Sequence, residues 1–231
     1  MEVGLKNEMR ERWREHAKNY DSAHAHGVGN PVEEQEWRDI FADKVGSSVL
    51  DVGTGTGFVS LIAAESGLDV TGVDWSDGMM GEARRKADER GLFIEFVLSE
   101  TEALPFDDES FDYLTSRHVI WTLTDPVAAF KEWYRVLKPG GMVFADYSPR
   151  PMPKEAQHYR LEIEEQLPLN REIDPEYVAD LFREAGFLKV EIEEREKHAH
   201  GHYHHEEDEH NEGEHEHHHV HGSRYLYKCT K

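Results

Sequence analysis

The stretch VLDVGTGTG, residues 49–57, decides the fold. Its apolar, β-branched start predicts a buried strand that runs into a glycine-rich loop. The three glycines let the backbone turn sharply and approach a ligand closely. The next residues, FVSLIAAESG at 58–67, predict a helix, whose N-terminus directs free N–H groups and the positive end of its dipole at that ligand. The stretch therefore predicts a strand, a ligand-binding loop and a helix.

An acidic residue at the end of the following strand narrows the class of ligand. This strand, LDVTGVD at 68–74, ends in Asp74, whose carboxylate can accept hydrogen bonds from both hydroxyls of a ribose. The glycine spacing, D-x-G-x-G-x-G, differs from the G-x-G-x-x-G of dinucleotide-binding enzymes. The pattern indicates a ligand that contains a nucleoside, and it disfavours a dehydrogenase.

Strands and helices alternate along most of the chain. Strands are predicted at 47–52, 68–74, 92–98, 111–116, 142–147, 187–194 and 224–230. Helices are predicted at 5–20, 33–43, 58–67, 76–91, 125–137, 154–167 and 174–186. This alternation is typical of an α/β domain with a parallel sheet and helices on both faces.

Composition excludes several classes of function. The 231 residues carry a net charge of −22, which argues against nucleic-acid partners and anionic membrane surfaces. The single cysteine, Cys229, excludes an internal disulfide framework and a site with several cysteine ligands. The sequence shows neither an apolar run long enough to span a membrane nor the apolar core of a signal peptide. We therefore expect a cytoplasmic protein, either a monomer or a homodimer.

Eleven of the 16 histidines lie between His198 and His221, among seven acidic residues and no Lys or Arg. We call residues 198–222 the histidine tract. Its composition predicts disorder without a ligand. Because a strand-like segment follows it, the tract is interpreted as an internal insertion, not a terminal tag. Imidazole and carboxylate together suit Ni²⁺, Zn²⁺, Co²⁺ or Cu²⁺. The predicted metal ligands are His198, His200, His202, His204, His205, His210, His215, His217, His218, His219 and His221.

Other interpretations of the histidines remain open. The tract could be a tolerated polar loop that binds metal only in vitro. The tetrapeptide at 24–27, HAHG, recurs at 198–201, so a metal shared with the N-terminal region is a further hypothesis. The whole chain could also be a metal-storage protein or metallochaperone on a scaffold that does not turn over.

Four motifs, in this order and spacing, together resemble class I S-adenosylmethionine-dependent methyltransferases. They are VLDVGTGTG at 49–57, VTGVDWSDGMM at 70–80, ETEALPF at 100–106 with FDYLTS after it, and RVLKPGG at 135–141. The resemblance is to the type 11 group, which includes enzymes of ubiquinone and menaquinone biosynthesis, and it covers roughly residues 13–190 and the last strand.

The resemblance implies a fold and a division of the chain. The fold is a Rossmann-like, seven-stranded α/β sheet whose last strand is antiparallel, with helices on both faces. Residues 1–45 would form a helical lid, 46–197 and 223–231 the methyltransferase domain, and 198–222 the inserted histidine tract. The implied activity is methyl transfer from S-adenosylmethionine to a small-molecule acceptor. In such a fold the tract would leave the sheet at the carboxyl ends of the parallel strands, where the active site lies.

The resemblance also implies site residues. Those matched to the cofactor are Tyr20, Asp51, Gly53, Thr54, Gly55, Gly57, Asp74, Trp75, Met79, Glu100, Thr101, Ser116 and Arg117. The sequence departs from the family at Glu100 and Thr101, where an Asp-Ala pair is usual; both side chains can still hydrogen-bond to adenine.

Methyl transfer needs mainly positioning of the nucleophile, and a base only where the acceptor must lose a proton. His118, just after the fourth strand, is the predicted base or substrate contact, because a neutral imidazole accepts protons near pH 7. Alternatively, His118 caps the next helix or packs under the cofactor. Tyr147 and Tyr159 are weaker pocket candidates.

Overall fold

A computed structural model describes residues 2–23, 31–149, 159–196 and 223–231. Seven strands form one sheet in the order β3-β2-β1-β4-β5-β7-β6. The strands are β1 (Ser48–Val52), β2 (Asp69–Asp74), β3 (Glu95–Leu98), β4 (Phe111–Ser116), β5 (Leu137–Tyr147), β6 (Lys189–Glu196) and β7 (Ser223–Thr230). All neighbours pair in parallel except β7, which is antiparallel to both β5 and β6. The predicted fold class and the antiparallel last strand are confirmed.

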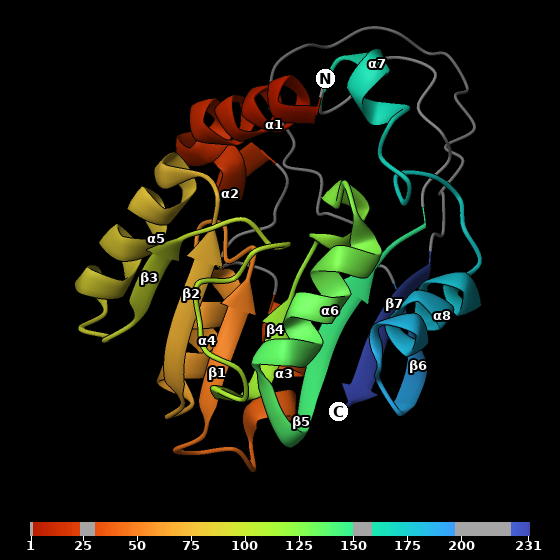
Figure 1. The fold of residues 1–231 in the computed structure, drawn as a ribbon. Coiled ribbons are helices and arrows are strands. Elements are labelled where there is room, and N and C mark those ends of the chain that lie inside the picture. The colour runs from red at the N-terminus through yellow and green to blue at the C-terminus, as the bar shows by residue number, and fades with distance from the viewer. Residues whose placement is uncertain (1, 24–30, 150–158, 197–222) are drawn as a thin grey trace, which may run out of the picture.

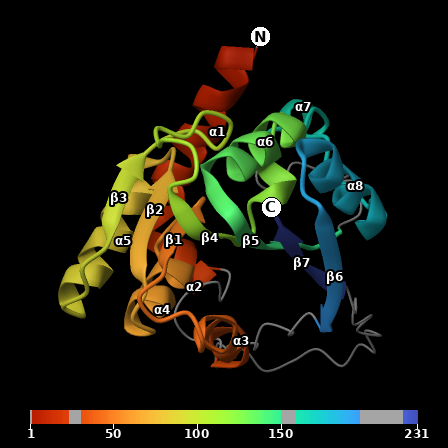
Figure 2. The same ribbon diagram turned by 60° about the horizontal axis from the view of Figure 1, so that its bottom comes forward.

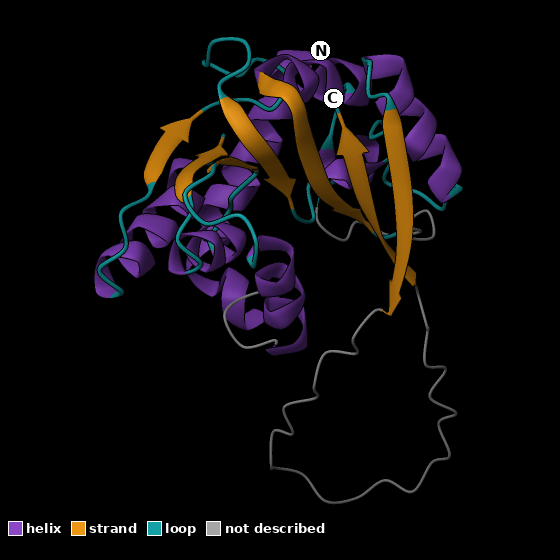
Figure 3. Cartoon of the chain, turned by 90° about the horizontal axis from the view of Figure 1, so that it is seen from below, coloured by secondary structure: helices purple, strands orange, loops and turns teal. Residues whose placement is uncertain are grey.

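Helices lie on both faces of this sheet (Figures 1 and 3). The α-helices are α1 (Glu2–His16), α2 (Tyr20–Ala23), α3 (Pro31–Phe41), α4 (Phe58–Glu65), α5 (Asp77–Glu89), α6 (Pro126–Val136), α7 (Leu161–Glu164) and α8 (Pro175–Ala185). Two 3-10 turns are η1 (Ala17–Asn19) and η2 (Ile120–Thr122). β3 and β6 form the two edges of the sheet (Figure 2).

Side chains of the central strands point alternately to the two faces of the sheet, and both faces are buried. Val143 and Ala145 of β5 belong to the core that includes residues of α6 and α8, whereas Phe144 between them packs with residues of α3 and α4. β7 alternates in the same way, with Leu226 on one face and Tyr227 on the other. This period of two is the expected consequence of a sheet covered on both sides.

Local signals in the sequence start the helices α5, α6 and α8. The Ser76 hydroxyl accepts a hydrogen bond from the Met79 N–H and caps α5. Asp125 and Asp174 cap α6 and α8 in the same way, each followed by a proline that has no N–H to satisfy. Gly186 in the left-handed region ends α8, as its position predicts.

Several predicted elements differ in extent, and the strand predicted at 142–147 begins five residues earlier, at Leu137. The helix predicted at 5–20 ends at His16 and continues as η1 and α2. The strand predicted at 92–98 begins only at Glu95, because the Leu92 N–H still donates to the Ala87 carbonyl at the end of α5. Within the described residues, the helix predicted at 154–167 is only the short α7, and 154–158 lie outside them.

The ends of the histidine tract are placed by the last two strands. Glu196 and Ser223 pair in register, next to Arg195 and Arg224. The same end of β7 pairs with the carboxyl end of β5, Tyr147 opposite Tyr225. The tract therefore leaves the sheet at the carboxyl ends of its parallel strands, as predicted, and its eleven histidines lie outside the described residues.

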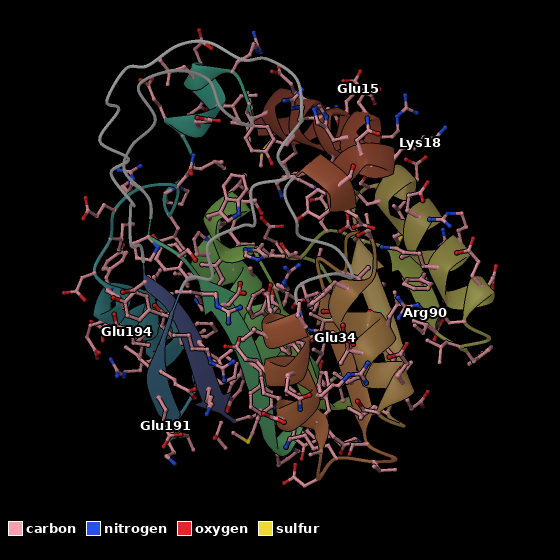
Figure 4. All side chains as sticks on the ribbon, turned by 180° about the vertical axis from the view of Figure 1, so that it is seen from behind. Glu15, Lys18, Glu34, Arg90, Glu191 and Glu194 are labelled. Atoms are coloured by element: carbon pink, nitrogen blue, oxygen red, sulfur yellow. The ribbon has the colours of Figure 1, made fainter. Side chains whose placement is uncertain are left out.

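The edge strand β6 presents charged side chains outward, and Figure 4 labels Glu191 and Glu194 on it. Charges on an edge strand disfavour pairing with a second sheet. Within the described part of the chain, no helix has the length and apolar character that a membrane span requires.

The seam between α6 and α8 offers a test of the fold. The rings of Phe130 and Phe182 stack with centroids 3.8 Å apart, and both are fully buried. We predict that Phe130→Ala lowers the free energy of unfolding by about 3–5 kcal/mol, because it removes apolar contacts and leaves a cavity. Urea denaturation measures this, with Phe93→Ala as the control, since Phe93 is 91% exposed. Equal stability of the two variants would contradict the packing described.

Candidate functional site

The glycine-rich loop joins β1 to α4 and passes very close to the segment after β4. Gly53 has a φ of +69°, and a Cβ there would lie 2.2 Å from Cγ2 of Val119. Gly57, with a φ of +89°, is the N-cap of α4, where a Cβ would lie 3.0 Å from that of Ala83 in α5. A side chain at either position would push these elements apart, so the loop needs glycine for both conformation and space.

Asp51 holds this loop from beneath. Its buried carboxylate accepts hydrogen bonds from the Ser60 hydroxyl of α4 at 2.7 Å and from the Thr115 hydroxyl of β4 at 2.9 Å. Desolvation by burial raises the pKa of Asp51, and these hydrogen bonds oppose the rise. Asp51 therefore ties three elements together under the loop.

Asp74 lies at the tip of β2, directly beside the loop. One carboxylate oxygen accepts the Gly55 N–H at 2.9 Å and the other accepts the Ser76 N–H at 2.8 Å. Desolvation raises the pKa of Asp74 to about 6, although both backbone N–H groups lower it. The carboxyl group is thus fixed in orientation, and each oxygen keeps capacity to accept a further hydrogen bond from a ligand.

A pocket opens above Asp74, at the carboxyl ends of the strands. It encloses about 670 Å³ of empty space, part of it open to solvent. The predicted site residues that line it are Tyr20, Gly53, Gly55, Asp74, Trp75, Met79, Thr101, Arg117 and His118. A smaller adjoining cavity is lined by Asp51, Thr54 and Arg117, among others. The structure therefore brings most of the predicted residues together.

Three predicted residues line neither cavity: Gly57, Ser116 and Glu100. Gly57 serves the start of α4, and Ser116 is fully buried at the end of β4. The Glu100 carboxylate is drawn to α1, where it pairs with Lys6 at 2.9 Å and Arg10 at 3.3 Å.

Glu102, which the motif did not indicate, lines the pocket in this region. Its carboxylate accepts hydrogen bonds from the hydroxyls of Thr101 and Thr124, both at 2.9 Å. Of these two acids, Glu102 lines the pocket, two residues further along the chain than the predicted Glu100.

α1 lies beyond the carboxyl ends of β1 and β2 (Figure 1), and the N-terminal segment contributes Trp13 and Tyr20 to the pocket lining. Trp13 Nε1 donates a 2.6 Å hydrogen bond to the Tyr159 hydroxyl, which links α1 to the segment before α7. Asp21 of α2 accepts hydrogen bonds from Thr56 in the glycine-rich loop at 2.6 Å and from Lys86 of α5 at 2.7 Å. Burial raises the pKa of Tyr20 to about 12, so its hydroxyl stays protonated. Trp13 gave no motif signal in the sequence.

Of the weaker candidates, Tyr147 is buried and its hydroxyl donates to the carbonyls of Leu169 and Arg171. Tyr159 is buried and accepts the hydrogen bond of Trp13 Nε1, but it does not belong to the pocket lining.

His118 lies at the rim of the same pocket in a conformation that is rare for residues other than glycine. Its φ is +59°, and its backbone N–H donates a 2.6 Å hydrogen bond to the carboxylate of Asp146 at the end of β5. Its Nε2 lies 3.8 Å from Oε1 of Glu33 in α3. Backbone strain of this kind persists only where neighbours enforce it and is enriched at functional sites. The structure agrees with a pocket position for His118 and leaves its role as a base a prediction.

A buried ion-pair cluster lies next to His118. It is formed by Glu33, Arg117, Asp146 and Arg224. Arg224 Nη1 lies 2.8 Å from Glu33 and 3.7 Å from Asp146. Desolvation raises the pKa of Asp146 to about 6, while Arg224 opposes the rise. Sequence analysis missed Glu33 and Asp146, because neither belongs to a local motif.

Three of these side chains have the chemistry of metal ligands. Ligand atoms of Glu33, His118 and Asp146 lie within 4.8 Å of one another. However, the guanidinium groups of Arg117 and Arg224 both pair with Glu33, and Arg224 also lies 3.7 Å from Asp146, so a cation would have to compete with two positive charges. The cluster is therefore interpreted as an ion-pair network, distinct from the predicted metal ligands of the histidine tract.

Comparison with known proteins gives the family. The model of the methyltransferase domain family matches residues 50–145. A demethylmenaquinone methyltransferase of Clavibacter sepedonicus is 34% identical over 190 residues, which cover 71% of this chain and 75% of that protein. A demethylmenaquinone methyltransferase of Thermus thermophilus is 37% identical over 139 residues, which cover 57% of this chain and 63% of that protein.

Solved structures share the fold. An S-adenosylmethionine-dependent methyltransferase from Thermotoga maritima superposes with a TM-score of 0.63 at 24% identity, covering 96% of this chain and 98% of that one. Phosphoethanolamine N-methyltransferase 2 of Haemonchus contortus, in complex with S-adenosyl-L-methionine, gives a TM-score of 0.62 at 24% identity, covering 84% and 43%. At these identities the likeness shows the fold alone. The extended sequence match carries the further step: the chain belongs to the class I S-adenosylmethionine-dependent methyltransferases, in the family that includes the demethylmenaquinone methyltransferases.

Proposed function

We propose that this protein transfers the methyl group of S-adenosylmethionine to a small, quinone-like acceptor. The observation that carries the proposal is Asp74, held by the Gly55 N–H at the tip of β2 and facing a pocket that Trp75 and Met79 also line. The quinone-like acceptor is taken from the names of the relatives.

The residues of the pocket fit this cofactor. Asp74 offers two fixed carboxylate oxygens to a pair of ribose hydroxyls. Trp75 and Met79 offer apolar surfaces to a flat base, and Gly53 and Gly55 of the glycine-rich loop line the same pocket, where the ribose and the methionine part would lie. When bound, S-adenosylmethionine would supply an electrophilic methyl group on a positively charged sulfur.

The chain's own residues would supply positioning and proton transfer. Trp13 and Tyr20 line the pocket and would help to hold the reactants in position for displacement at a methyl carbon. His118, at the rim, would accept the proton that a hydroxyl or activated carbon acceptor loses as its new bond to the methyl group forms. The division into lid, methyltransferase domain and insertion, the cytoplasmic location, the monomeric or dimeric state, and the lack of nucleic-acid and membrane partners stay predictions.

We also propose that the histidine tract binds Ni²⁺, Zn²⁺, Co²⁺ or Cu²⁺ through its eleven imidazoles. The composition supports this, because His-x-His and His-His pairs beside carboxylates suit these ions. The residues that flank the tract, Glu196 and Ser223, lie at the carboxyl ends of the parallel strands, as the pocket does. A regulatory, sensing or substrate-related role for the metal would follow from that position.

The proposed activity is tested on the full chain. Isothermal titration calorimetry should show binding of S-adenosylmethionine, and mass spectrometry should then show one methyl group added to a demethylated naphthoquinol acceptor. If neither S-adenosylmethionine nor S-adenosylhomocysteine binds, the proposal fails and the metal-storage alternative gains support.

Binding of S-adenosylhomocysteine should weaken as pH falls through about 6, the pKa of Asp74. Below that pH the carboxylate gains a proton and loses accepting capacity toward the ribose, so the dissociation constant should rise by up to about tenfold per pH unit. Asp74→Asn should bind weakly at pH 7.5 and lose this pH dependence. Affinity equal to that of the wild type at pH 7.5 would refute the ribose assignment.

Deleting residues 198–221 should remove most Ni²⁺ and Zn²⁺ binding, measured by equilibrium dialysis, and should leave cofactor binding intact. In the full chain, metal affinity should fall below about pH 6 as imidazoles become protonated. Metal binding retained by the deletion variant would place the site elsewhere in the chain.

A further inference from the structure

Glu33 is a buried carboxylate on the first turn of an otherwise amphipathic helix. It is 5% exposed, whereas its neighbour Glu34, labelled in Figure 4, pairs with Arg38 on the same helix. α3 lies on the face of the sheet opposite α6 and α8 (Figure 4). A carboxylate at this depth is costly unless charged partners meet it there.

The partner that Glu33 meets most closely is Arg117 at the end of β4. Arg117 Nε donates to Oε1 at 2.7 Å and Nη2 donates to Oε2 at 2.8 Å, which is the two-bond fork of a guanidinium and a carboxylate. The Phe58 ring lies 4.2 Å from the Arg117 Cζ. The fork fixes the plane of the guanidinium, and the ring limits its movement out of that plane.

Glu33 stays ionised because positive groups surround it. Arg224 Nη1 donates to its Oε1 at 2.8 Å. Burial raises the pKa of Glu33, but the hydrogen bonds and charge of Arg117, together with His118 and Arg224, bring it down to about 2. The fork is therefore present across the pH range in which the protein would work.

Arg117 is shared by the two cavities of the site. It lines the larger pocket with Asp74 and Trp75, and the smaller cavity with Thr54 and the rest of the glycine-rich loop. The ribose end of the proposed cofactor belongs at Asp74, so the loop side of Arg117 is where its amino-acid end would lie.

We infer that Glu33 is a positioning residue that holds the Arg117 guanidinium against the amino-acid end of the cofactor. The inference rests on the proposed function, and it adds a residue that belongs to none of the family motifs. Glu33 acts through Arg117 and needs no contact with the cofactor itself.

Two ligands separate positioning from general damage to the pocket. S-adenosylhomocysteine carries the amino-acid end, whereas 5′-methylthioadenosine lacks it and keeps the adenosine. Glu33→Gln should weaken S-adenosylhomocysteine binding about tenfold or more, the effect of one disturbed charge-assisted hydrogen bond, and should leave methylthioadenosine affinity within about twofold. Calorimetry on the full chain measures both. In an Arg117→Gln background, Glu33→Gln should cause no further loss, because the two residues act as one unit.

The matched control is Glu34→Gln, on the same helix. Glu34 pairs with Arg38, one turn along that helix, at 2.7 Å. This variant should keep the affinity for both ligands. Glu33→Asp keeps the charge but is too short for the full fork, so it should show a smaller loss confined to S-adenosylhomocysteine. It also serves as the test if Glu33→Gln does not fold, which thermal unfolding would show.

Equal losses for both ligands in the Glu33 variants, or no loss for either, would overturn the inference while the wild type still binds. A wild-type chain that binds neither ligand would overturn the proposed function, and this inference with it.

Discussion

The close approach of the glycine-rich loop to the segment after β4 is the constraint on which the rest of the site depends. The absent Cβ of Gly53 leaves room for Val119, so the two chain segments meet above the carboxyl ends of β1 and β4. Beneath this contact, the Asp51 carboxylate accepts hydrogen bonds from the Ser60 and Thr115 hydroxyls and so holds both segments in place. Because both segments are held, Asp74 at the end of β2 converges on one pocket with Arg117 and His118, which follow β4.

The cofactor half of the site could be predicted from the sequence because its signals are local. The glycines and Asp74 are specified within two consecutive strand–loop units, where spacing fixes geometry. The other half depends on contacts between distant residues. Glu33 meets Arg117 only because α3 packs across the sheet, and Asp146 reaches the backbone of His118 only through the pairing of β4 with β5. No periodicity or motif encodes such contacts.

Glu100 shows, over a shorter distance, that a motif does not predict contacts with residues from another element. Glu100 occupies the motif position, but Lys6 and Arg10 on α1 attract its carboxylate away from the pocket. Glu102 remains at the lining, oriented by two threonine hydroxyls. Motif alignment assigns a residue by order along the chain, whereas the orientation of its side chain depends on partners from other elements. Lys6 lies 2.9 Å from Glu100 and 3.6 Å from Glu102, so the hydroxyls of Thr101 and Thr124, and not charge alone, distinguish the acid that lines the pocket.

The position of the insertion follows from the pairing of β6 with β7. Their adjacent ends, Glu196 and Ser223, are in register, so any inserted loop has to close only one inter-strand distance of about 5 Å. The entropic cost of closing a loop grows slowly with its length, so a long tract costs little more than a short turn. Arg195 and Arg224, the paired residues at these ends, both reach Glu36, and Arg224 also reaches Glu33. These buried ion pairs fix the last strand pair independently of the tract, so the sheet and the pocket beside it can keep their geometry whatever the loop binds.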